Sequence, residues 1–168
     1  MRDVRAALDE SGMDAELLEL EVAEDLLMHD LPGTRRVLSE LKALGVRIVV
    51  DQFGVGYSSL TRLERLPLDA IKIDGSFVHQ VSEASAGFTD AVVALGRTLS
   101  LTVVGQGVET DEQATFLRDH GCDELQGFHV HRPMRPQELE EVLREHHRDD
   151  DPGAALGGSG ASKPAAVR

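Results

Sequence analysis

The sequence predicts an α/β fold built from repeated strand–helix units. Short apolar runs alternate with helical segments along most of the chain. The apolar runs are rich in β-branched residues and lack polar alternation, which is typical of strands buried on both faces of a parallel sheet. Such units either close into a barrel or form an open, doubly wound sheet. Both arrangements place functional residues at the carboxyl ends of the strands.

Five segments are expected to be strands. In chain order they are Leu18–Val22, Val46–Asp51, Ala70–Asp74, Leu101–Gly105 and, with a weaker pattern, Asp123–Gly127. A closed βα barrel needs eight strands and roughly 200–250 residues. The strand–helix pattern here is confined to residues 1–148. The sheet is therefore either open or part of a larger barrel.

Four segments between and after these strands are expected to be helices: Pro32–Leu44, Ala86–Leu99, Asp111–Asp119 and Pro136–His146. The first carries leucines on one face and stops at Gly45, a common C-terminal signal. The second places Phe88, Val92 and Leu99 on one apolar stripe. Thr110 followed by Gln113 reads as a capping box for the third.

The composition changes at residue 149. A run of aspartates leads into a segment of glycine, serine, alanine and proline that cannot bury a core. We therefore expect a partial domain over residues 1–148 and a disordered tail over residues 149–168.

Charge and composition exclude several classes of protein. The net charge of -13 repels phosphate backbones, so we expect no binding to DNA or RNA. No segment approaches the ~18 consecutive apolar residues of a membrane span. The single cysteine, Cys122, allows no intrachain disulfide, and no apolar run follows the first residues. Together these features predict a cytoplasmic protein.

Polar side chains gather at the predicted strand ends. They are Glu21, Asp51, Gln52, Lys72, Gln106, Glu109 and Gln126. Converging carboxylate and amide oxygens suit Mg²⁺ or Mn²⁺, and a nearby lysine could orient a water or neutralise a phosphate oxygen. Taken singly, each has a simpler explanation, because a carboxylate there often caps a helix and a buried lysine often pairs or snorkels.

Five segments, in order, resemble the signature motifs of the EAL family. They are Leu18–Glu24 (LELEVAE), Asp51–Leu60 (DQFGVGYSSL), Leu66–Asp74 (LPLDAIKID), Val103–Thr110 (VVGQGVET) and Gly121–Phe128 (GCDELQGF), the last followed by Arg132-Pro133. The resemblance covers residues 4 to 146. It implies an incomplete TIM-type barrel, with about five of the eight strands. It also implies enzymes that use two divalent cations, Mg²⁺ or Mn²⁺, to hydrolyse cyclic-di-GMP to the linear dinucleotide pGpG.

The resemblance also implies roles for the residues at the strand ends. Metal ligands are expected at Glu21, Asp51 and Gln52. Lys72 matches the lysine near the nucleophilic water, and Gln106 stands where the family uses a glutamate for metal binding and water activation. The remaining catalytic assignment is Glu109, which matches a glutamate that anchors the loop after the second strand. Gln126 matches a polar residue near the substrate, metal and water.

Three departures from the family pattern bear on activity. The resemblance begins partway into the family domain, after three strands that carry the Glu-Ala-Leu motif and an asparagine ligand. Gln52 replaces an aspartate, and Gln106 replaces a glutamate. Each glutamine removes one negative charge, and its amide cannot accept a proton usefully at neutral pH. Proton-transfer catalysis alone contributes roughly 10²–10⁴-fold.

We therefore expect a degenerate EAL domain that is inactive or severely impaired, binds metal weakly or not at all, and has a regulatory or protein-interaction role. One alternative is a residual metal-dependent phosphodiesterase whose missing ligands come from another segment or chain. Another is a non-catalytic receptor for cyclic-di-GMP. Because a five-stranded piece of a barrel leaves two sheet edges uncovered, self-association or a protein partner is also expected.

Overall fold

The predicted apolar runs form one parallel sheet of five strands. The computed structural model describes residues 2–55, 60–79 and 81–149. The strands are β1 (Glu19–Ala23), β2 (Arg47–Phe53), β3 (Ala70–Ile73), β4 (Thr102–Gln106) and β5 (Glu124–Gln126). They lie in chain order, each parallel to the next. All five predicted strands are confirmed, with each end within two residues of the predicted one.

Four predicted helices are confirmed, and several shorter ones are added. In chain order the helices are α1 (Arg2–Ser11), the 3₁₀ helix η1 (Ala15–Leu17), α2 (Glu24–His29), α3 (Leu31–Lys42), α4 (Leu60–Leu63), α5 (Gly75–Val78), α6 (Glu83–Leu99), α7 (Asp111–Asp119) and α8 (Pro136–Asp149). The Thr110–Gln113 capping box forms as predicted. A second box between Ser82 and Ser85 starts α6 three residues earlier than predicted. Among the described residues, no helix combines the length and apolarity needed to cross a bilayer.

The sequence pattern did not reveal α1, α2, α4 and α5. Three of them have six residues or fewer, too short for a helical period to be recognised. α1 is longer but contains no buried residue. At the other end, α8 continues through Asp149, the first residue of the expected tail. The rest of that tail, residues 150–168, lies outside the described residues.

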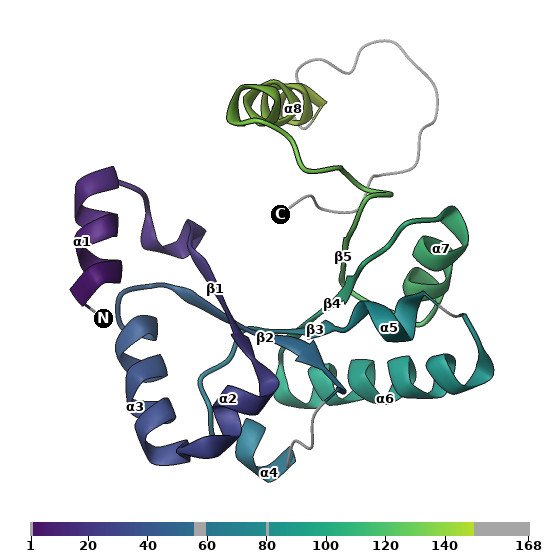
Figure 1. Cartoon of the computed structure of the whole chain (residues 1–168), viewed down its shortest axis with the longest axis horizontal. Coiled ribbons are helices and arrows are strands. Elements are labelled where there is room, and N and C mark those ends of the chain that lie inside the picture. The colour runs from purple at the N-terminus through teal and green to yellow at the C-terminus, as the bar shows by residue number, and fades with distance from the viewer. Residues whose placement is uncertain (1, 56–59, 80, 150–168) are drawn as a thin grey trace.

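The sheet curves as an open part-barrel with most of its helices on the outer face (Figure 1). The main core lies between sheet and helices, where Ile48, Ile71 and Ile73 meet helix residues such as Leu41 and Leu117. A second cluster contains only Val49, Ala70 and Val104. Since successive strand residues point to opposite faces, this smaller cluster belongs to the inner face. The inner face therefore has a narrow apolar strip in an otherwise polar surface.

Two aspartates from the signature motifs hold the start of a strand to its neighbour. Asp69 directly precedes β3, where its N–H donates to the Ile48 carbonyl and its Oδ2 accepts from the Ile48 N–H at 2.7 Å. Asp123 precedes β5 and makes the same two contacts with Val103, the side-chain one at 2.8 Å. Both motif aspartates therefore align strands within the sheet.

The cysteine is an unreactive, partly buried residue that packs against the core. Cys122 lies half-buried after α7 as a free thiol. Burial, together with the neighbouring Asp123 carboxylate, raises the pKa of its thiol to about 12. Because the thiolate is the nucleophilic form, the group stays protonated and inert at neutral pH.

Candidate functional site

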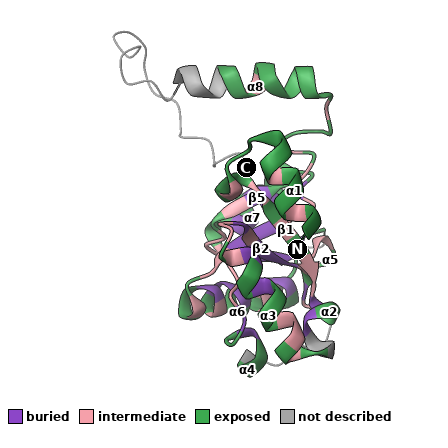
Figure 2. Ribbon diagram, turned by 90° about the vertical axis from the view of Figure 1, so that its left-hand side faces the viewer, coloured by how far each residue is buried: buried purple, intermediate pink, exposed green. Residues whose placement is uncertain are grey.

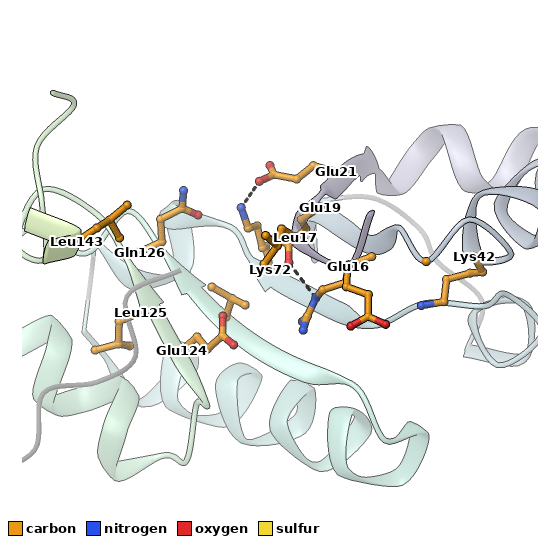
Figure 3. Close-up of a pocket in the computed structure, with 13 residues that line it drawn as sticks. Glu16, Leu17, Glu19, Glu21, Lys42, Lys72, Glu124, Leu125, Gln126 and Leu143 are labelled. Atoms are coloured by element: carbon orange, nitrogen blue, oxygen red, sulfur yellow. Dashed lines mark hydrogen bonds and ion pairs between the residues drawn. The ribbon is translucent and has the colours of Figure 1, made fainter. Parts of the chain in front are cut away.

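An ion pair between two strands forms the centre of the candidate site. The Lys72 ammonium, on β3, donates to Oε1 of Glu21, on β1 (Figure 3). The Lys72 side chain is only 4% exposed, whereas the Glu21 side chain is 42% exposed. Since β2 lies between β1 and β3, the pair spans one intervening strand. Two residues predicted for catalysis and metal binding thus engage each other.

The residues after the middle of β2 lie on an irregular stretch of strand. The register between β2 and β3 shifts between Val50 and Phe53. Within this stretch Gln52 has a φ of 55°, in the left-handed region, and its side chain is exposed. A bulge of this kind changes which face successive side chains meet and is common next to active sites.

Asp51 has one oxygen that lacks a partner. Its Oδ1 is buried and makes no hydrogen bond within the described part of the chain. An unsatisfied buried polar atom costs about 1–3 kcal/mol, more for a charged group. Such an oxygen suits a cation or a donor supplied from outside, so Asp51 is the one predicted ligand whose environment fits a metal.

The glycine directly after β2 is bound by Glu24, which is not among the seven predicted site residues. Glu24 is buried at the start of α2, and its Oε2 accepts the Gly54 N–H at 2.9 Å. Gly54 has a φ of 103°, and an added Cβ there would collide with Phe88. Phe88 in turn stacks on Phe77 with ring centroids 3.9 Å apart. The signal in the sequence was an acidic residue just after the first predicted strand.

Glu109 is the predicted loop anchor. It is exposed beyond the end of β4, and its backbone N–H donates to Oε1 of Gln113 at 2.7 Å. This contact belongs to the start of α7. In the described part of the loop, the contact with a carboxylate comes from Glu24, so the anchoring role of Glu109 stays a prediction.

Two glutamines end adjacent strands. Gln106 on β4 is paired in register with Gln126 on β5. Gln106 is half-buried, and Gln126 is exposed. Two neutral amides therefore stand side by side at this end of the sheet, at one position where the family resemblance implies a charged carboxylate.

An open cavity of about 1170 Å³ lies against the inner face of the sheet (Figure 3). Its lining includes Glu21, Lys72 and Gln126, but not Asp51, Gln52, Gln106 or Glu109. The other lining residues are Glu16, Leu17, Glu19, Lys42, Gly45, Arg47, Val104, Glu124, Leu125 and Leu143. The structure thus gathers three of the seven predicted residues around one cavity.

These side chains do not fit a centre for two divalent cations. Within the described residues, no three histidine, cysteine, aspartate or glutamate side chains come together as a set of metal ligands. Glu21 is bound by the Lys72 ammonium, and positions 52 and 106 carry neutral amides. Asp51 alone cannot offset the charge of two dications, which take several oxygen ligands each.

Comparison with known proteins assigns the family. The family model described as "EAL domain" matches residues 1–133. The chain is 44% identical over 152 residues to the cyclic di-GMP phosphodiesterase NbdA of Pseudomonas aeruginosa, covering 89% of this chain and 19% of that protein. It is 45% identical over 138 residues to the bifunctional diguanylate cyclase/cyclic di-GMP phosphodiesterase MucR of the same species, covering 81% of this chain and 20% of that protein. The chain thus spans about a fifth of the length of these relatives.

Solved structures of EAL proteins support the same family assignment. The PaMucR phosphodiesterase in its c-di-GMP complex superposes with a TM-score of 0.78 at 44% identity, over 81% of this chain and 56% of that one. The EAL domain of Mycobacterium smegmatis DcpA superposes with a TM-score of 0.80 at 35% identity, over 86% of this chain and 66% of that one. Klebsiella pneumoniae BlrP1 in a manganese/cyclic-di-GMP complex superposes with a TM-score of 0.69 at 32% identity, over 74% of this chain and 32% of that one. By sequence and by fold, this chain belongs to the EAL domain family.

Proposed function

We propose that this chain is a catalytically inactive or severely impaired EAL domain that acts in cyclic-di-GMP signalling through regulation or protein interaction. The observation that carries the proposal is the Lys72–Glu21 ion pair. A carboxylate that should hold a metal is neutralised by a buried ammonium of the same chain.

Electrostatics supports the proposal. A cation that took the place of Lys72 at Oε1 of Glu21 would leave a buried ammonium without its partner, at a cost of about 3–5 kcal/mol. A cation at the other carboxylate oxygen would be repelled by the nearby ammonium. The amides of Gln52 and Gln106 supply no charge to offset that loss. The relatives named as phosphodiesterases give the signalling context.

A turnover assay tests the proposal. The 168-residue chain is incubated with cyclic-di-GMP and Mn²⁺, and the linear dinucleotide is followed by chromatography, with the PaMucR phosphodiesterase as the active control. We expect no product from the chain, nor from a Gln52→Asp/Gln106→Glu variant, in which Glu21 still pairs with Lys72. Product that disappears on Asp51→Ala would show that the surviving ligands suffice and would overturn the proposal.

A second candidate, a non-catalytic receptor for cyclic-di-GMP, is favoured by one feature. Just beyond β5, Phe128 is 52% exposed, and the Arg132 guanidinium lies 5.4 Å from its ring centroid. An exposed aromatic ring beside an arginine can stack on a base. Calorimetric titration with cyclic-di-GMP and Ca²⁺ distinguishes this candidate: saturable binding that Phe128→Ala weakens would support it, and no heat of binding would exclude it.

A further inference from the structure

Asp51 has a carboxylate that the chain leaves partly unsatisfied. Its strand, β2, is mostly buried within the sheet (Figure 2). Asp51 itself is half-buried, and its Oδ1 makes no hydrogen bond within the described part of the chain. Beside it in register on β1 stands Ala23, whose methyl group cannot donate a hydrogen bond. The neighbouring strand on that side therefore offers this oxygen no donor side chain.

Three other acidic side chains at this end of the sheet already have partners. Glu21 binds the Lys72 ammonium, and Glu24 and Asp74 each accept a backbone N–H. The Lys72–Glu21 pair has no net charge, so it repels an approaching cation far less than a free ammonium would. Among the acidic side chains that the structure describes, Asp51 is the one with a buried oxygen that lacks a partner.

A single available carboxylate fits a guanidinium better than a metal ion. A divalent cation takes several oxygen ligands, and no three acidic, histidine or cysteine side chains come together among the described residues. A guanidinium needs one carboxylate, because its planar fork of N–H donors binds both oxygens at once. The torsion that turns the Asp51 carboxylate is broad, so both oxygens can face such a fork. The exposed amide of Gln52, the next residue, supplies a further acceptor.

Exposed apolar side chains lie on the segments next to this carboxylate. Val55, just after β2, is 65% exposed, and Leu26, on α2, is 60% exposed. The hydrogen bond from the Gly54 N–H to Glu24 joins these two segments. Binding hot spots combine an arginine or aromatic anchor with surrounding contacts that exclude water. Asp51, Val55 and Leu26 therefore present the charge and the apolar area of a protein-binding surface.

We propose that Asp51 binds an arginine side chain of a partner protein, with Val55 and Leu26 contacting apolar residues on either side of that arginine. The inference rests on the proposed protein-interaction role and specifies the chemistry of the partner, a basic segment with apolar flanks. The net charge of -13 attracts such a segment and raises its rate of association. The same charge disfavours an acidic occupant.

A peptide titration tests the guanidinium. The probe is a short blocked peptide with an arginine between two leucines, and two matched peptides carry citrulline or lysine in its place. Binding to the 168-residue chain is followed by NMR chemical shifts at fixed ionic strength. We expect the citrulline peptide to bind at least about tenfold more weakly than the arginine peptide, and the lysine peptide about threefold more weakly. Equal affinity of the arginine peptide and either matched peptide would overturn the proposal.

Matched variants test the surface. Asp51→Asn and Asp90→Asn change the net charge equally, and Asp90 is exposed on α6, outside the candidate site. Asp51→Asn should weaken the arginine peptide at least about tenfold, and Asp90→Asn less than about twofold. Val55→Ser should weaken it about threefold, whereas Val37→Ser, at a valine 42% exposed on α3, should leave it unchanged. Equal weakening by the two aspartate variants would show attraction by net charge alone and overturn the site.

The melting temperature gives a second measurement that needs no ligand. Asp51→Asn should raise it by about 2–4 °C, because the change removes an uncompensated charge and breaks no hydrogen bond of Oδ1. Asp90→Asn should raise it by less. An unchanged or lower value for Asp51→Asn would show that the chain already satisfies this carboxylate, against the proposal. Titration with Mn²⁺ alone tests the other occupant, and tight binding that displaces the arginine peptide would overturn the proposal.

The turnover assay and the peptide titration separate the two proposals. A chain that hydrolyses cyclic-di-GMP and also binds the arginine peptide through Asp51 supports this inference and removes the claim of inactivity. An inactive chain whose peptide binding is insensitive to Asp51→Asn does the reverse.

Discussion

At the scale of single residues, the Lys72–Glu21 pair is asymmetric. Lys72 is buried within the sheet, and Glu21 remains in contact with water. Losing Glu21 would leave a buried ammonium without compensation, whereas losing Lys72 would leave a carboxylate that solvent can still hydrate. The two partners of one ion pair therefore contribute unequally to stability.

This asymmetry predicts different costs for the two truncations. Glu21→Ala should lower the free energy of unfolding by about 3 kcal/mol. Lys72→Met should lower it by about 1 kcal/mol or less, because the methionine fills the apolar part of the lysine site and Glu21 stays hydrated. Urea denaturation of both variants, at matched m-values, measures the difference. Equal costs, or a larger cost for Lys72→Met, would contradict the asymmetry.

At the scale of elements, the end of β2 and the start of α2 are joined by one carboxylate. Glu24 begins α2 and binds the Gly54 N–H directly after β2. The stacked rings of Phe77 and Phe88, on α5 and α6, pack near the same glycine. Gly54, at the start of the loop for which the sequence resemblance implied one anchor, is thus contacted by residues from three helices.

Two glutamate variants decide which residue anchors this loop. Glu24→Ala should speed hydrogen exchange at the Gly54 amide by about tenfold or more, since a hydrogen bond to a carboxylate is worth about 1.5–3 kcal/mol. Glu109→Ala is the matched control and should leave that amide unchanged, because Glu109 is exposed beyond β4. NMR-detected exchange gives both rates. Faster exchange only in the Glu109 variant would support Glu109, and not Glu24, as the anchor.

At the scale of the whole molecule, the excess of negative charge opposes folding. The net charge is -13, and a compact chain concentrates that charge. Among the described residues, the ion pairs with a partner that is only partly exposed or buried include Lys42–Asp69, whose side chains are 32% and 25% exposed, and Lys72–Glu21, whose lysine is 4% exposed. Such pairs are screened less than exposed charges. Added salt should therefore weaken the repulsion among the excess negative charges more than it weakens the attraction within these two ion pairs.

We accordingly expect the melting temperature to rise between about 0.05 M and about 0.5 M NaCl, over which the Debye length falls severalfold. A gain of about 1 kcal/mol corresponds to ~2–4 °C for a chain of this size. The melt is followed by circular dichroism at low protein concentration, and KCl at equal ionic strength serves as the control. A falling melting temperature would show that the attractive pairs dominate.

The order of strands and helices could be predicted because it depends on local patterns. β-branched apolar runs gave the five strands, and the Thr110–Gln113 pair gave the start of α7. The motif order also gave the family, which the comparisons confirm. Short helices such as α4 and α5 were missed because four residues contain little more than one helical turn.

The sequence by itself thus determined the family, the sheet and the neutral amides at Gln52 and Gln106. The tertiary structure decided which side chains meet. Lys72 reaches Glu21 across 51 residues of chain and an intervening strand, and Glu24 reaches Gly54 across 30. The cavity joins Leu17 and Leu143 from opposite edges. Such contacts depend on strand register and sheet curvature, which arise from packing of the whole sheet and leave no period in the local sequence.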